Sequence, residues 1–174
     1  MALVAIAGCA TAPRPAGEAP PAAELQERAA ALFDAAAHGD ELRLKTLVDW
    51  PRWRTFDGLQ RAGSDAQAAE VLSRIEAEPR ATATFVDGAV TGVRARLAEV
   101  TAGTLPPRLR TGVMNATVAA WRRGPAEGTP PSLARLQTLV AESLAGAREV
   151  TYDGSKRVTL VFSGTLLVGV VDAR

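Results

Sequence analysis

Asp34 and His38 are a pair of side chains whose types and spacing could support catalysis or metal binding. Residues four apart share one face of a helix, where a carboxylate can orient an imidazole as a general base or a metal ligand. His38 is the only histidine, and no second His or pair of Cys residues completes a zinc-ligand set. A histidine in the last turn of a helix also interacts favourably with the helix C-terminus. We favour this second interpretation and expect no metal site.

The segment WPRWR at residues 50–54 places two indoles beside two guanidinium groups. Trp50, Arg52, Trp53 and Arg54 could form an interaction patch, since membrane-interface segments and stacking sites for sugars or anions combine the same side chains. In the alternative interpretation, one or both indoles pack in the core and the arginines point to solvent. Large apolar rings are usually mostly buried, which favours this alternative.

Cys9 is the only cysteine, so it has no partner in the chain for a disulfide and its thiol is free for another use. The sequence IAGC at residues 6–9 resembles the lipobox of bacterial lipoproteins. The resemblance implies cleavage before Cys9 and attachment of diacylglycerol to its thiol. No Lys or Arg precedes Arg14, although a signal peptide normally begins with a positively charged segment. The apolar stretch has only eight residues, near the lower end of the roughly 7–15 residues that are usual. We therefore interpret residues 1–8 as a signal-peptide remnant.

Residues 9–21 are interpreted as the lipidated cysteine followed by a Pro/Ala-rich tether. The stretch ATAPRPAGEAPP contains four prolines and shows no hydrophobic periodicity, which is typical of an extended linker. In many lipoproteins of Gram-negative bacteria, Asp after the lipidated cysteine retains the protein at the inner membrane. Ala10 stands there in this chain, so the resemblance implies an outer-membrane protein that faces the periplasm or the cell surface.

The charge balance argues against a nucleic-acid-binding role. The chain has 20 basic and 19 acidic side chains in 174 residues, giving a net charge of +1, whereas nucleic-acid-binding domains usually concentrate a basic surplus on one face. The sequence also contains no P-loop, no dinucleotide-binding glycine fingerprint, no G-x-S-x-G elbow and no H-E-x-x-H helix. We therefore expect no cofactor.

Residues 22–146 show the apolar spacing of helices. Gly39 suits a helix C-terminus, Asp40 and Asp49 are candidate N-caps, and Ser64 with Gln67 matches a capping box. Residues 82–86 fit either a short strand or an extended link. The predicted helices span residues 22–38, 40–49, 49–63, 64–79, 89–101 and 106–124, and a last helix ends near residue 145.

Residues 147–174 change to the alternating pattern of β-strands. Strands are predicted at residues 149–152, 157–162 and 166–171, joined by turns at Asp153-Gly154 and Ser163-Gly164. The last strand is apolar on both faces, so we expect it to lie centrally or under helices. The predicted fold is a single α+β domain over residues 22–174, mainly helical, with a C-terminal three-stranded antiparallel β-meander.

The helix–Gly-Asp–helix opening and the terminal VTLVFSGTLLVGVV stretch are together similar to the ketosteroid-isomerase-like α+β domains, in which a curved sheet surrounds a pocket. No catalytic residue of that superfamily can be placed on this chain.

Two functions follow as hypotheses. The first is a lipid-anchored, non-catalytic structural or interaction module of the cell envelope, with the membrane and an envelope protein or the cell wall as partners. The second is a ligand-binding or enzymatic pocket between the helices and the meander, lined by Trp50, Trp53, Phe85 or Tyr152.

Overall fold

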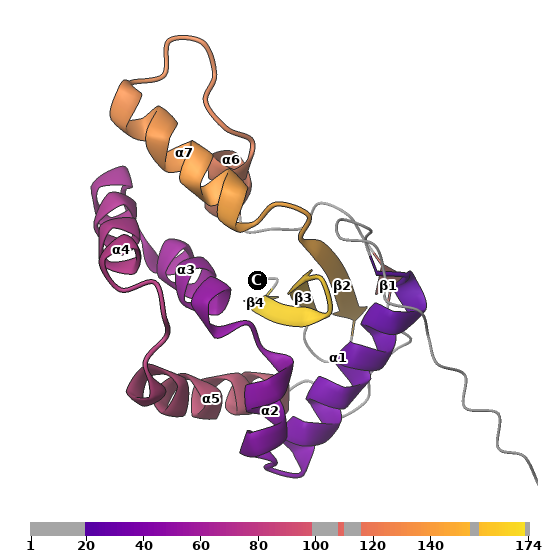
Figure 1. The fold of residues 1–174 in the computed structure, drawn as a ribbon. Coiled ribbons are helices and arrows are strands. Elements are labelled where there is room, and N and C mark those ends of the chain that lie inside the picture. Colours follow the sequence, from indigo (N-terminus) through magenta and orange to yellow (C-terminus); the bar gives the residue numbers. More distant parts are fainter. Residues whose placement is uncertain (1–19, 99–107, 110–115, 154–156, 173–174) are drawn as a thin grey trace, which may run out of the picture.

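The computed structural model describes residues 20–98, 108–109, 116–153 and 157–172 (Figure 1). It confirms a mainly helical α+β fold that ends in an antiparallel meander. Cys9, the signal-peptide remnant and nearly all of the tether lie outside the described residues. The elements are α1 (Ala22–Ala37), α2 (Glu41–Leu47), α3 (Trp50–Arg61), α4 (Asp65–Ala77), α5 (Ala83–Ala98), β1 (Arg108–Leu109), α6 (Ala116–Arg122), α7 (Pro131–Ser143), β2 (Arg148–Asp153), β3 (Arg157–Ser163) and β4 (Leu166–Asp172).

The predicted N-caps of α2, α3 and α4 are confirmed. The side chains of Asp40, Asp49 and Ser64 each accept a hydrogen bond from the backbone N–H three residues later. These bonds satisfy donors that the first turn of a helix leaves without a partner. The Gln67 side chain accepts from the Gly63 N–H at 2.7 Å, one residue before the cap, so the capping box closes in a shifted form.

The predicted meander is confirmed, because β2, β3 and β4 pair as consecutive antiparallel strands. The register shifts between Val161 and Phe162, which pair with Gly169 and Leu167, so Val168 is the extra residue of a β-bulge in β4. Val158, Leu160 and Phe162 belong to one core cluster, as the alternating pattern predicted for one face of the strand. The two-residue strand β1 adds a fourth member by pairing with β2.

Strand β4 lies at the end of the strand order and is covered by α3. Its outer edge is closed by the chain between α2 and α3. The Asp49 N–H donates to the Leu167 carbonyl at 2.9 Å, and the Gln60 side chain donates to the Val170 carbonyl at 3.4 Å. The expectation of a strand under helices is therefore confirmed, while a central position in the sheet was wrong. These contacts protect an edge that would otherwise pair with another chain.

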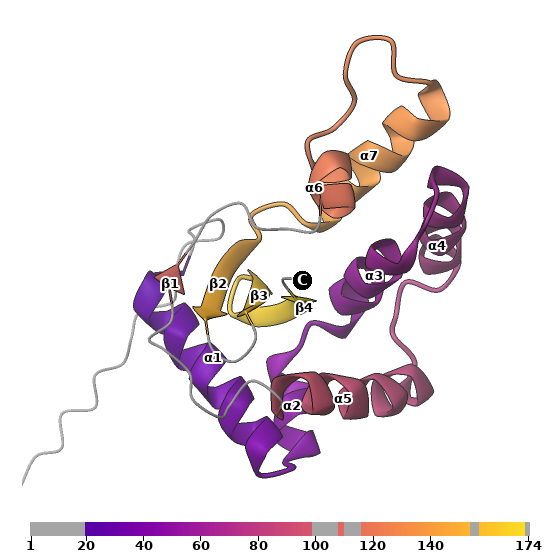
Figure 2. The same ribbon diagram turned by 180° about the vertical axis from the view of Figure 1, so that it is seen from behind.

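The sheet separates two hydrophobic cores (Figure 2). One core joins α1, α2, α5 and the start of α3 to one face of the sheet, and its fully buried members include Leu25, Leu44, Val90 and Phe162. The other core joins the rest of α3 to α4, α6, α7 and the opposite face. Helix α3 contributes to both, since Trp50 and Trp53 enter the first and Phe56 and Leu59 the second.

Helix α5 begins at Ala83, not near residue 89 as predicted, so the interpretation of residues 82–86 as a strand or extended link was wrong. The β-branched residues there favour a strand. The hydroxyl of Thr82, however, accepts a hydrogen bond from the Phe85 N–H at 3.2 Å and caps the first turn. Phe85 also packs against the first core, and this burial outweighs the local preference.

The helix predicted from residue 106 to 124 was wrong in its first part. Arg108 and Leu109 form β1, which pairs with Thr151 and Val150 of β2. Pairing with an exposed strand edge satisfies backbone groups as well as a helix does. The described part of the helix is α6, and it ends before Gly124, which takes the left-handed conformation with φ +80°.

Candidate functional site

The two indoles of the WPRWR segment lie in the core. Trp50 is 8% exposed and Trp53 is 4% exposed. Their rings meet edge to face with centroids 6.4 Å apart. The Trp50 Nε1–H donates to the Lys45 carbonyl at 3.0 Å, which compensates for burying this polar group. The indoles therefore do not form an exposed aromatic patch.

The two arginines of the segment bind neighbouring elements. Arg52 donates from Nε to the Ser143 carbonyl in the last turn of α7 at 3.1 Å. Arg54 donates to the Glu78 carbonyl at 3.0 Å, and its guanidinium lies 5.8 Å from the centre of the Phe85 ring. These contacts tie α3 to α7, to the end of α4 and to α5. The four predicted patch residues thus divide between the core and the surface.

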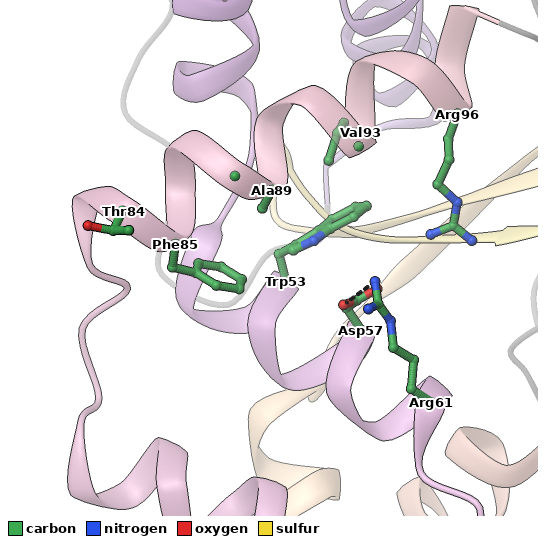
Figure 3. A pocket seen from close by; sticks show the side chains of 10 residues that line it. Trp53, Asp57, Arg61, Thr84, Phe85, Ala89, Val93 and Arg96 are labelled. Atoms are coloured by element: carbon green, nitrogen blue, oxygen red, sulfur yellow. Dashed lines mark hydrogen bonds and ion pairs between the residues drawn. The ribbon is translucent and has the colours of Figure 1, made fainter.

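A cleft of about 380 Å³ lies between α3 and α5, and Figure 3 shows the side chains that line it. The two helices are held by different neighbours, since α5 packs on α1 and α2 while α3 packs on β4 and α4. The cleft is therefore a gap between two independently supported walls. Its lining residues are Trp53, Asp57, Arg61, Thr84, Phe85, Gly88, Ala89, Gly92, Val93 and Arg96.

The floor of the cleft is apolar and firmly packed. Trp53 and the 1% exposed Val93 form it, and Trp50 supports the Trp53 indole from the core side. The half-buried Phe85 and Ala89 continue the apolar surface along α5. In Figure 3 the Phe85 ring and the Trp53 indole lie side by side between the two helices. This surface would bury apolar atoms of a ligand.

Charged side chains from both walls lie at one end of the cleft. On α3, Arg61 Nη2 lies 2.9 and 3.0 Å from the two carboxylate oxygens of Asp57. On α5, Arg96 Nη2 donates to Asp172 Oδ2 at the end of β4, at 2.9 Å. Figure 3 shows the Arg96 side chain reaching from α5 toward Asp57 and Arg61. The lining itself carries two guanidinium groups and one carboxylate.

Two glycines in the middle of α5 widen the cleft. Gly88 and Gly92 are one helical turn apart, and a Cβ atom at either position would meet no atom within 4 Å. A glycine inside a helix costs about 1 kcal/mol relative to alanine. No neighbouring atom requires a glycine at either position. The absence of a side chain at these two positions leaves open space in the cleft beside α5.

Asp34 and His38 lie at the end of α1, away from the cleft. The His38 Nδ1 lies 2.9 Å from the Asp34 carbonyl oxygen and 3.2 Å from its carboxylate, and the His38 side chain is 75% exposed. The Asp34 carboxylate also pairs with Arg43. Gly39 follows with φ +69°, as predicted for a helix C-terminus. No cluster of three potential metal ligands occurs among the residues that the structure describes.

Two of the four residues suggested for a pocket line the cleft, namely Trp53 and Phe85. Tyr152 lies instead in the first core, where its ring meets Phe33 edge to face at 4.7 Å. Burial raises the pKa of Tyr152 from 10.0 to about 12. The cleft lies between two helices rather than between helices and sheet, and its contact with the sheet runs through Arg96 and Asp172.

The charged and glycine residues of the cleft were not predicted from the sequence. One available signal was the spacing of Trp53, Asp57 and Arg61, which places all three on one face of α3. Another was the G-x-x-x-G spacing of Gly88 and Gly92. Neither signal shows that the two helix faces meet, because this depends on how α3 and α5 pack on the rest of the fold.

Comparisons with known proteins yield no match: no protein-family model fits the chain, and neither curated proteins nor solved structures are significantly similar to it. Within the described ranges, no helix is both long and apolar enough to cross a membrane.

Proposed function

We propose that this protein is a lipid-anchored protein of the bacterial cell envelope whose folded domain is a non-catalytic binding module. The α3–α5 cleft is its binding surface. The observation that carries the proposal is the combination, in one open cleft, of an apolar floor at Trp53 with charged groups at one end. Ligand sites in proteins are typically concave and mainly apolar, with a few placed polar groups that fix orientation.

The position of the cleft relative to the start of the fold supports the anchored arrangement. Arg148 at the start of β2 donates to the carbonyl of the buried Pro20 at 3.4 Å, so the chain enters the fold beside the sheet. In both views helix α1 begins next to β1 and β2, while α3 lies by the opposite edge strand β4 and α5 packs near the far end of α1 (Figures 1 and 2). A tether arriving at Pro20 from a lipid on Cys9 would leave the cleft accessible.

The anchor is tested by detergent phase partitioning combined with intact-mass analysis. Wild type and Cys9→Ser are produced in a bacterial host behind a complete leader peptide. We expect the wild type to enter the detergent phase with a mass that shows cleavage before Cys9 and added acyl chains, while Cys9→Ser stays in the aqueous phase. Equal aqueous partitioning of both proteins, without added mass, would contradict the anchor.

A further inference from the structure

We propose that the α3–α5 cleft binds a small monocarboxylate with an aromatic or branched aliphatic body. This inference rests on the proposed function, because it names the ligand class for the same binding surface. The carboxylate lies between Arg61 and Arg96, and the body lies on Trp53 in the space in front of Gly88 and Gly92.

The floor of the cleft selects an apolar body. Trp53 and Val93 are already almost fully buried and form a fixed base, while the half-buried Phe85 and Ala89 supply apolar surface that a ligand can cover. The half-buried Phe85 ring also favours contact with a second aromatic ring. The missing Cβ atoms of Gly88 and Gly92 leave room for a ring or a branched chain beside α5.

The guanidinium groups at one end of the cleft favour a carboxylate as the polar group of the ligand. Arg61 and Arg96 contribute two positive charges, and the carboxylates paired with them, Asp57 and Asp172, contribute two negative charges. A ligand carboxylate would accept charge-assisted hydrogen bonds from the guanidinium donors that these pairs leave unused, whereas a neutral amide is a weaker acceptor. The second carboxylate near the site, Asp172, is 58% exposed and lies outside the lining.

The two guanidinium groups retain donors for a ligand. Each arginine has five N–H donors, and within the described residues Arg61 and Arg96 use only Nη2 in their contacts. Arg96 is the more enclosed member of its pair, with a side chain 35% exposed. Arg61 is 77% exposed and extends toward solvent. We therefore expect Arg96 to contribute more to affinity than Arg61, because a less hydrated charge interacts more strongly.

The inference is tested by calorimetric titration with two probes of the same shape, phenylacetate and phenylacetamide. Replacing the carboxylate by the neutral amide removes the charge-assisted hydrogen bonds to the arginines and keeps the ring. We expect phenylacetamide to bind roughly tenfold more weakly than phenylacetate. Titration with benzyl alcohol measures binding of the apolar body without either group.

Three variants locate the binding. Arg96→Gln should weaken phenylacetate binding roughly tenfold and leave phenylacetamide binding unchanged. Gly88→Leu should abolish binding of all probes, because its side chain fills the cleft, and it should fold because its Cβ meets open space and leucine favours helices. Arg74→Gln is the matched control, since Arg74 pairs with Glu70 on the exposed face of α4. It should change neither affinity.

The outcomes separate the ligand class from the binding surface. Equal affinity for phenylacetate and phenylacetamide, lost in Gly88→Leu, would overturn the carboxylate inference and leave the cleft as the binding surface. Binding that survives Gly88→Leu would place the ligand elsewhere and overturn the inference. If none of the three probes binds, both the ligand class and the role of the cleft are refuted.

Discussion

Replacing Gly169 by alanine should strongly destabilise this fold. Gly169 lies in β4 opposite Val161, next to the bulge. A Cβ atom there would lie 2.2 Å from Cδ1, 2.3 Å from Cε1 and 2.7 Å from Cγ of the Phe56 ring. Such distances are far shorter than van der Waals contact, so either the ring or the strand must move.

The magnitude follows from how little the ring can move. Phe56 is 1% exposed and belongs to the second core, so its displacement disturbs packed neighbours on α3, α4 and α6. Overpacking a core typically costs about 1–3 kcal/mol, and we expect the upper end here. Loss of glycine's freedom in the unfolded chain offsets up to about 1 kcal/mol. The net loss should be at least about 2 kcal/mol, or roughly 4–8 °C in Tm.

Urea denaturation followed by tryptophan fluorescence measures this loss, since Trp50, Trp53 and Trp121 are all buried. The double variant Phe56→Leu/Gly169→Ala should be less destabilised than the sum of the two single variants, because the smaller side chain makes room for the new methyl group. A Gly169→Ala variant as stable as wild type, or strictly additive effects in the double variant, would refute this packing.

Three further predictions concern stability. Gly88→Ala, whose Cβ meets open space, should raise the free energy of unfolding by about 1 kcal/mol in urea denaturation; a decrease would contradict the open cleft. Asp49→Ala should lower it by about 1–2 kcal/mol through loss of the α3 cap, while Asp49→Asn retains most of the stability. The phenol of Tyr152 ionises near pH 10 in the unfolded chain and at about 12 in the fold, so its contribution is complete below pH 10 and is lost as pH rises to 12. Wild type should lose up to about 2.7 kcal/mol more than Tyr152→Phe over this window, measured as unfolding free energy against pH; parallel curves would contradict it.

The elements that could be predicted from the sequence are those with local causes. The meander was predicted because turn residues and alternating apolar residues act over a few positions, and the caps at Asp40, Asp49 and Ser64 because each bonds within its own first turn. These interactions need no information about the rest of the chain. The prediction of a mainly helical α+β fold rested on such signals.

The errors in the fold arise where distant contacts decide the outcome. Leu109 continues an apolar helical pattern, yet its backbone pairs with Val150, which is far away in the sequence. Residues 82–86 contain β-branched side chains, yet Phe85 packs on the first core and Thr82 caps the helix. In both segments tertiary contacts override the local preference.

The cleft could be predicted only in fragments. The sequence drew attention to Trp53 and Phe85 as large rings, but their burial and proximity follow from the packing of α3 and α5 on different partners. The position of Arg96 opposite Arg61 depends on the same packing. A pattern within one helix identifies a face, and only the fold shows which face it meets.

The central claim, that the α3–α5 cleft is the binding surface, is tested most directly by nuclear magnetic resonance of the three tryptophan indoles. Trp53 lines the cleft, while Trp121 lies in the second core and serves as the internal control. During titration with phenylacetate, the Trp53 Nε1–H signal should shift progressively and saturate, the Trp121 signal should stay fixed, and Gly88→Leu should abolish the shift. A saturable shift at Trp121 alone, or no shift at any indole, would contradict the claim.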